Sequence, residues 1–288
     1  MKVWINGKFL DEAEAKISVF DHGTLYGDGV FEGIRVYDGR PFQAQAHVDR
    51  LYESARRLRL AIPYTKQELI DAMVETCRAN DMIDGYLRPV VTRGRGTLGI
   101  SPFKCSNPNV VIIAGQVALY PDEMYAEGMA VIIAKTVRTS SEMLPPSVKS
   151  LNYLNNILAK IEAVDAGVAE AIMLNANGNV AECTGDNIFI VAGGTVITPP
   201  DAAGILLGIT RAVVGRLVER LGISLILKDI TPQDVYTADE CFLTGTAAEV
   251  IAVTKVDARP IGDGNVGPIT RKLMDAFRQF VRSDEAYK

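Results

Sequence analysis

The stretch Ser147–Leu158, SVKSLNYLNNIL, constrains the fold more than any other, because a helical pattern begins within it directly after Pro145 and Pro146. Apolar residues then recur at spacings of three and four, which predicts an amphipathic helix. Gly167 suits the C′ position at which such a helix stops. The apolar residues at this spacing are Leu151, Leu154, Leu158 and Ile161.

Lys149 lies on the last residues before this helical pattern. In a helical conformation, Tyr153 would lie on the same face as Lys149, one turn further on. A lysine packed against apolar neighbours at the mouth of a cleft can lose its proton near neutral pH, and carbonyl chemistry needs an uncharged amine. Lys149 is therefore a candidate nucleophile, although a lysine at a helix start is more often a solvated surface residue.

The composition indicates a globular protein with enough apolar residues for a sizeable core. The 288 residues suffice for two domains or one large one, and 48% are hydrophobic and 23% charged. A net charge of −5 argues against nucleic-acid binding, which requires a basic patch. The longest apolar run, Val110–Leu119, is interrupted by Gly115 and is shorter than the roughly 18 residues of a membrane span. We therefore expect neither nucleic-acid nor membrane partners.

Cysteine and histidine are too scattered to indicate a disulfide framework or a metal site. The four cysteines form no CxxC pair, and His22 and His47 are the only histidines. The N-terminal sequence enters a strand-and-turn pattern directly, without the apolar segment of a signal peptide. We therefore expect a cytoplasmic protein without a bound metal. The cysteines are Cys77, Cys105, Cys183 and Cys241.

The first 119 residues alternate strand and helix signals. Asn6-Gly7 marks a two-residue hairpin, and the glycines between Gly23 and Gly33 suit either a close backbone approach to a ligand or a plain loop. Arg50 lies near the start of the first of two amphipathic helices, where spacing alone favours a surface cation. The predicted elements are helices at His47–Leu60 and Glu68–Ala79, strands at Tyr86–Thr92 and Val110–Leu119, and a basic glycine loop from Arg93 to Pro102.

A polar turn, Tyr120–Glu123, is the expected linker to the remaining part of the chain. There, Thr210 is the expected N-cap of a helix that ends at Gly222, and its glycine-preceded start would offer free backbone N–H groups to a phosphate. The turn Gly245–Glu249 would direct further N–H groups at an anion. The predicted strands are Gly128–Val137, Ala171–Asn175, Asn187–Val191 and Glu240–Thr244.

Several features of the chain suit one ligand that carries an aldehyde, a ring nitrogen and a phosphate. Pyridoxal phosphate is such a ligand, since its chemistry needs a lysine Schiff base and an acidic partner for the pyridine nitrogen. The features are an amine (Lys149), a phenol (Tyr153), a carboxylate before a strand (Glu182), and two anion cradles, Gly208–Thr210 and Gly245–Ala247.

Seven segments form an ordered set along the chain: FDHGTLYGDGVFEGIRVY, HVDRL, YLRP, SVKSLNYLNNILAK, AECTGDNIF, GITR and TGTAAEV. Together they resemble the class IV, or fold type IV, pyridoxal-phosphate aminotransferases, and most closely the branched-chain amino acid aminotransferases. The resemblance implies an α/β fold of the α+β type. It also implies a small N-terminal α/β domain (1–119), a linker (120–127) and a larger C-terminal pseudo-barrel domain (128–288), with the cofactor between the domains.

The resemblance further implies roles for the residues that match the family pattern. Lys149 would carry the cofactor as a Schiff base and move the substrate proton, while Glu182 would pair with the pyridine nitrogen. Tyr153 would hydrogen-bond the phenolic oxygen of the ring. The phosphate would be held by Arg50, Ile209, Thr210 and Thr246.

The implied substrate residues form a second group. The backbone of Thr246 and Ala247 would receive the α-carboxylate. Arg88, unless it merely forms a surface salt bridge, would let one pocket accept both an aliphatic side chain and the second carboxylate of glutamate or 2-oxoglutarate. The side-chain pocket would be shaped by Tyr26, Phe31, Gly33 and Tyr86.

The implied reaction moves the amino group of leucine, isoleucine or valine to 2-oxoglutarate, in a homodimer or larger homo-oligomer such as a hexamer. Ser150-Leu151-Asn152 and Thr92-Arg93-Gly94 instead match D-amino acid aminotransferases, whereas Tyr153 and the run Phe31–Arg35 fit the branched-chain group. Aminodeoxychorismate lyase is another enzyme of this fold, and a phosphate-ligand binding protein with an inert lysine is the non-enzyme alternative.

Overall fold

The computed structural model describes residues 1–116 and 120–287, which form two compact units. The first unit contains residues 1–116, 148–152 and 281–287, and the second contains residues 120–147 and 153–280. The predicted domain boundary at Leu119 lies outside the described residues. Within the predicted linker 120–127, α4 (Asp122–Glu127) is helical and belongs to the second unit.

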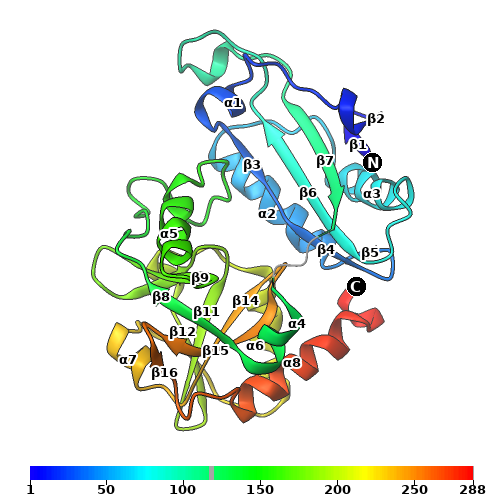
Figure 1. The fold of residues 1–288 in the computed structure, drawn as a ribbon. Helices are drawn as coiled ribbons and strands as arrows, with labels where there is room; N and C mark the ends of the chain where they lie inside the picture. The colour runs from blue at the N-terminus through cyan, green and yellow to red at the C-terminus, as the bar shows by residue number, and fades with distance from the viewer. Residues whose placement is uncertain (117–119, 288) are drawn as a thin grey trace. The chain divides into compact units, whose positions relative to one another are not determined.

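The first unit is built on a seven-stranded antiparallel sheet. Its strands are β1 (Lys2–Ile5), β2 (Lys8–Asp11), β3 (Gly29–Phe31), β4 (Ile34–Tyr37), β5 (Arg40–Pro41), β6 (Gly85–Thr92) and β7 (Asn109–Gly115). Their order is β2-β1-β7-β6-β4-β5, and β3 pairs with β6 (Figure 1). The predicted hairpin is confirmed, because Asn6 and Gly7 join β1 to β2 with positive φ values of 50° and 88°.

Two amphipathic helices, α2 (Ala44–Arg57) and α3 (Lys66–Arg78), pack against this sheet (Figure 1). Both agree with the predicted helices, although α2 begins three residues earlier than expected and therefore places Arg50 in its interior. Thr65 and Glu68 form a capping box at the start of α3. Burial alternates along β6, so that Leu87 joins the core beneath the helices while Tyr86 and Arg88 lie on the other face. A short helix, α1 (His22–Tyr26), lies within the glycine-rich segment.

The second unit is built on a nine-stranded mixed sheet. Its strands are β8 (Met129–Ile133), β9 (Glu170–Leu174), β10 (Val180–Cys183), β11 (Asn187–Ala192), β12 (Thr195–Thr198), β13 (Leu225–Leu227), β14 (Glu240–Gly245), β15 (Glu249–Val256) and β16 (Arg259–Pro260). The order is β10-β9-β8-β15-β14-β11-β12-β13, with β16 paired to β15. The pairs β8–β9, β8–β15 and β12–β13 are parallel, and the others are antiparallel.

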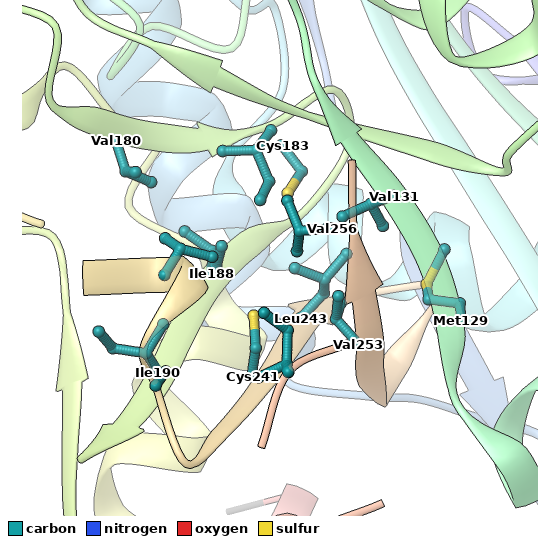
Figure 2. Close-up of a cluster of buried hydrophobic side chains, with 14 of the residues drawn as sticks. Met129, Val131, Val180, Cys183, Ile188, Ile190, Cys241, Leu243, Val253 and Val256 are labelled. Carbon is teal, nitrogen blue, oxygen red and sulfur yellow. The ribbon is translucent and has the colours of Figure 1, made fainter. Parts of the chain in front are cut away.

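A large cluster of buried apolar side chains forms the main core of the second unit, and Figure 2 shows its members on β8, β10, β11, β14 and β15. The central strands are buried on both faces, which explains their nearly continuous apolar runs. Ile188 and Ile190 of β11 point into the core of Figure 2, while Phe189 stacks on Phe242 of β14 with ring centroids 4.9 Å apart. Burial raises the pKa of the Cys241 thiol in this core to about 12.

The longer helices of the second unit are α5 (Leu154–Asp165), α6 (Ile209–Arg220) and α8 (Pro268–Val281), and α7 (Pro232–Tyr236) is a single short turn. The predicted stop signals are confirmed, since Gly167 and Gly222 follow α5 and α6 with φ values of 73° and 70°. The predicted N-cap of α6 is wrong: Gly208 is the N-cap, and Thr210 is buried inside the first turn. Among the described residues, no helix is both long and apolar enough to cross a membrane.

The apolar face of α5 points away from the core of the second unit. Asn156, Ala159 and Ala163 form the buried face, and small residues allow the helix to pack closely there. The large apolar side chains lie on the opposite, exposed side. Their exposed fractions are 66% for Leu154, 51% for Ile157, 48% for Leu158, 49% for Ile161 and 65% for Val164.

Candidate active site

Lys149 is held in an extended segment at the edge of β3. Phe31 N donates to Lys149 O at 3.0 Å, and Leu151 N donates to Gly29 O at 2.9 Å. Between them, Ser150 forms a β-bridge with Val30. Two main-chain hydrogen bonds therefore fix the backbone of the candidate nucleophile as in a sheet.

The predicted helical relation between Lys149 and Tyr153 is wrong. Helix α5 begins at Leu154 with Tyr153 as its N-cap, so neither residue lies within the helix. The physical reason is the pairing with β3, because a segment that donates and accepts in a sheet ladder cannot also form helical hydrogen bonds. Lys149 belongs to the first unit and Tyr153 to the second.

The Phe31 ring is contacted by both the Lys149 and the Arg88 side chains within the first unit. The Lys149 ammonium nitrogen lies 4.8 Å from the centroid of the Phe31 ring, and the Arg88 guanidinium lies 4.8 Å from the same centroid. Arg88 Nη2 also donates to Tyr86 Oη at 3.2 Å. Arg88 Nε is buried and has no hydrogen-bond partner among the described residues. A buried guanidinium donor of this kind suits a ligand carboxylate.

The Tyr86 side chain occupies the space next to Gly33, so position 33 has no room for a larger residue. A Cβ atom at position 33 would lie 1.7 Å from Tyr86 Oη, so any larger residue would displace the tyrosine. Tyr26 lies at the end of α1 and is 38% exposed, and its hydroxyl donates to Leu98 O. The predicted pocket residues Phe31, Gly33 and Tyr86 are thus brought together with Arg88, whereas Tyr26 is held by the loop that contains Leu98.

Arg50 is paired with a carboxylate that the sequence did not single out. Its Nε and Nη2 donate to the two oxygens of Glu32, each at 2.7 Å, and His47 Nδ1 lies 2.7 Å from Glu32 Oε2. Glu32 and His47 are 0% and 1% exposed. The i,i+3 spacing of His47 and Arg50 on α2 was a signal for a shared face, but the acidic partner is remote in sequence.

The charge of Arg50 governs the ionisation of this cluster. Although burial raises the pKa of the Glu32 carboxyl, the charge and hydrogen bonds of Arg50, together with His47, hold that pKa far below its usual range. Burial lowers the pKa of His47 more than the hydrogen bond to Glu32 raises it. The cluster at neutral pH is thus a carboxylate, a guanidinium and a neutral imidazole.

Glu182 is a buried carboxylate in β10 of the second unit. Its Oε1 accepts from Arg138 Nε at 2.9 Å, and its Oε2 accepts from Asn187 Nδ2 at 3.1 Å and Leu206 N at 2.9 Å. Arg138 and Asn187 were missed by sequence reasoning, since Arg138 lies in an irregular segment 44 residues earlier. An anion held in this way suits a protonated ring nitrogen.

The start of α6 has the features of an anion site. Gly208 caps the helix without a side-chain hydrogen bond, and Ile209 and Thr210 form its first turn. A Cβ atom at Gly208 would lie 2.0 Å from Asn187 Oδ1, so this position requires glycine. No side chain caps the N-terminus of this 12-residue helix. Its first N–H groups and the positive end of its dipole therefore suit a phosphate.

Thr246 and Ala247 lie at the tip of the turn that joins β14 to β15. Gly245 pairs with Glu249 at its base, and a Cβ atom on Gly245 would lie 1.8 Å from Asp186 Oδ1. Thr246 and Ala247 are half-buried. The turn is therefore constrained at its base and carries its two small residues at the tip, and its role in anion binding stays a prediction.

The chemical groups of the predicted site residues match those that pyridoxal phosphate requires. The first unit supplies an amine and a guanidinium, and the second supplies a phenol, a buried carboxylate and an uncapped helix N-terminus. Each of these groups matches one functional group of the cofactor. The predicted residues of the first unit are Tyr26, Phe31, Gly33, Arg50, Tyr86, Arg88 and Lys149, and those of the second are Tyr153, Glu182, Ile209, Thr210, Thr246 and Ala247.

Comparison with known proteins shows the family of the chain. The sequence profile of the family described as "Amino-transferase class IV" matches residues 29–256. A Methanocaldococcus jannaschii protein assigned as a branched-chain-amino-acid aminotransferase is 51% identical over 278 residues, which are 96% of each chain.

Two solved structures share the fold over nearly the whole chain. One is the T.th. branched-chain amino acid aminotransferase with pyridoxamine 5′-phosphate, which is 38% identical with a TM-score of 0.95 over 99% of this chain and 96% of the other. The second is the branched-chain aminotransferase of Thermoproteus uzoniensis with norvaline, which is 40% identical with a TM-score of 0.93 over 99% and 97%. The chain belongs to the class IV aminotransferases, and within them to the fold type IV branched-chain amino acid aminotransferases.

Proposed function

We propose that the protein transfers the amino group of leucine, isoleucine or valine to 2-oxoglutarate, giving the branched-chain 2-oxo acid and L-glutamate, with pyridoxal 5′-phosphate as cofactor. The observation that carries this proposal is the placement of Lys149. Its backbone is fixed along β3, and its amine shares the Phe31 ring with the guanidinium of Arg88. An amine beside an aromatic wall and a carboxylate-binding guanidinium suits a 2-amino acid with an apolar or acidic side chain.

The cofactor residues act by binding and orientation. Bound pyridoxal phosphate supplies the electron sink that labilises the Cα proton of the amino acid. Lys149 would hold the cofactor covalently and, once released by substrate, carry that proton. Glu182, kept in place by Arg138 and Asn187, would hold the ring nitrogen protonated. Tyr153 would donate to the phenolic oxygen, and the phosphate would bind to Arg50, Ile209, Thr210 and Thr246.

The substrate residues would separate the carboxylates from the side chain. The backbone of Thr246 and Ala247 would receive the α-carboxylate. Arg88 would bind the second carboxylate of glutamate through its unpaired Nε, and the neighbouring Phe31 ring would offer an apolar surface to a branched side chain. The pocket for that side chain would be lined by Tyr26, Phe31, Gly33 and Tyr86.

A substrate panel tests the reaction. We expect L-leucine, L-isoleucine or L-valine with 2-oxoglutarate to yield glutamate, measured by coupled glutamate detection. Higher turnover with D-alanine than with all three would contradict the branched-chain assignment in favour of a D-amino acid aminotransferase. Release of pyruvate from aminodeoxychorismate without an amino acceptor would identify a lyase. Failure of every arm would favour a phosphate-ligand binding protein.

Replacement of Arg88 by leucine should separate the two kinds of substrate. We expect the KM for 2-oxoglutarate to rise by roughly 10- to 100-fold, because a buried carboxylate loses a charged partner worth about 1.5–3 kcal/mol. The KM for leucine should change by less than about threefold, since an apolar side chain needs no cation. Steady-state kinetics with each substrate varied measure this difference. The exposed Arg78→Leu is the matched control, and an equal effect on both substrates would argue against the role of Arg88.

We also propose that the chain forms a homodimer or larger homo-oligomer and acts in the cytoplasm. The exposed apolar stripe of α5 supports the first point, because it is wide enough to be a buried helix face and lies opposite the face that already packs on β9. A second copy of the same helix would bury the stripe isologously. Four free cysteines fit a reducing compartment and support the second point.

Replacement of Leu158 by glutamate should weaken this assembly. A charge on a buried apolar interface is costly, so we expect the variant to elute with a smaller mass than the wild-type protein. Size-exclusion chromatography with light scattering gives the masses. The matched control, Gln279→Glu, adds the same charge at an exposed polar position of α8 and should leave the mass unchanged. A monomeric wild-type protein would disprove the assembly.

A further inference from the structure

One face of α2 carries three polar side chains, two of them buried and the third, Arg50, half-buried, that reach two other segments of the first unit. His47, Arg50 and Ser54 recur at spacings of three and four and therefore share a face. His47 and Arg50 contact Glu32, and Ser54 Oγ accepts a hydrogen bond of 3.2 Å from Lys149 N. A single helix thus contacts both the segment before β4 and the segment that carries Lys149.

Glu32 holds one edge of the Arg50 guanidinium. The bidentate pair uses Nε and Nη2, so the plane and the rotamer of the guanidinium are set by the carboxylate. The third contact fixes the carboxylate itself: an ionised carboxylate only accepts hydrogen bonds, so His47 Nδ1 carries the hydrogen and donates it to Glu32 Oε2. No rotation of Arg50 is possible without breaking two charge-assisted hydrogen bonds.

The two residues adjacent to Glu32 have their own contacts with the candidate active site. Phe31 N holds the carbonyl of Lys149, and Gly33 leaves the space that Tyr86 Oη occupies. Glu32 N donates to Pro89 O at 2.9 Å, which ties the same tripeptide to β6. The orientation of Arg50 and the position of the Lys149 backbone are therefore set by consecutive residues of one strand region.

We propose that Glu32, supported by His47, is a positioning residue that presents the Arg50 guanidinium to the cofactor phosphate in register with Lys149. The inference rests on the proposed function, because it assumes that Arg50 binds the phosphate. A flexible arginine would lose side-chain entropy on binding the phosphate, whereas a guanidinium already held by Glu32 does not. The buried carboxylate thus increases phosphate affinity through Arg50 without contacting the phosphate.

The test is a binding measurement on the full-length chain freed of cofactor. Calorimetric titration of the wild-type protein with pyridoxal 5′-phosphate, inorganic phosphate and pyridoxal separates the phosphate contribution from that of the ring. For Glu32→Gln we expect roughly tenfold to hundredfold weaker binding of pyridoxal 5′-phosphate and weaker binding of inorganic phosphate. Binding of pyridoxal, which has no phosphate, should be unchanged. The double variant Glu32→Gln/Arg50→Gln should bind no more weakly than Arg50→Gln alone.

A second pair of variants keeps the test independent of the folding of Glu32→Gln. His47→Asn retains a donor near the position of Nδ1 and should keep most of the affinity, whereas His47→Leu removes the donor and should weaken phosphate binding. Glu170→Gln is the matched control: Glu170 is 1% exposed and accepts hydrogen bonds from Thr184 and Ala171, so its loss tests the effect of any buried carboxylate on affinity.

The outcomes separate the two hypotheses. Wild-type binding of pyridoxal 5′-phosphate no tighter than that of pyridoxal would refute the phosphate role of Arg50 in the proposed function. If wild type and Arg50→Gln behave as expected, three results would each overturn the positioning role alone: wild-type affinity in both Glu32→Gln and His47→Leu, an equal loss with pyridoxal, or an equal loss in Glu170→Gln.

Discussion

Replacement of Lys149 by alanine should lower transamination by roughly 10³-fold or more while the protein remains folded. Proton transfer by a positioned group contributes about 10²–10⁴ in rate, and Lys149 would additionally hold the cofactor covalently. The backbone hydrogen bonds that fix residue 149 come from main-chain atoms, so alanine keeps the pairing with β3. The loss should therefore be chemical and not structural.

Three measurements check this expectation. Glutamate formation from leucine and 2-oxoglutarate gives the rate, and borohydride reduction followed by mass spectrometry locates the covalently fixed cofactor. The wild-type protein should be yellow and carry the label on Lys149, and Lys149→Ala should be colourless and unlabelled. Lys66→Ala, which alters a half-exposed lysine paired with Asp49, is the control and should behave as wild type. Full activity of Lys149→Ala would refute the mechanism.

Replacement of Arg138 by methionine should lower the free energy of unfolding by about 3–5 kcal/mol. Arg138 and Glu182 have side chains that are only 9% and 6% exposed, so removing the cation takes the ion-pair partner from a carboxylate in the interior. The same change should lower activity, because Glu182 would lose the partner that keeps it in the orientation in which it could hold the ring nitrogen. Urea denaturation of the cofactor-free chain measures the free energy of unfolding.

Two comparisons separate buried charge from lost packing. In Arg138→Met/Glu182→Gln the buried negative charge is absent as well, so we expect most of the lost stability to return. Arg78→Met removes the cation of an exposed pair with Glu75 and should cost less than about 1 kcal/mol. If Arg138→Met costs no more than Arg78→Met, the buried pair does not stabilise the second unit.

Local sequence patterns predicted most of the helices and strands correctly. The hairpin at Asn6-Gly7, strands β6 and β14, and the glycine stops after α5 and α6 are confirmed, because each depends on the conformational preferences of a few adjacent residues. The two errors in this group have one cause. The start of α5 and the cap of α6 depend on partners elsewhere, since strand β3 holds Lys149–Leu151 in an extended form and Asn187 packs against Gly208.

Seven ordered motifs in the sequence determined the family, and with it the candidate amine, carboxylate and anion-binding turns. Only the tertiary structure showed which side chains form hydrogen bonds and ion pairs with these candidate residues. Glu32 and Arg138 became visible as partners of Arg50 and Glu182 through contacts spanning 18 and 44 residues, and the apolar face of α5 proved to be exposed. The physical reason is that hydrogen bonds and burial depend on distance in space, whereas sequence periodicity reports only which side chains share a face.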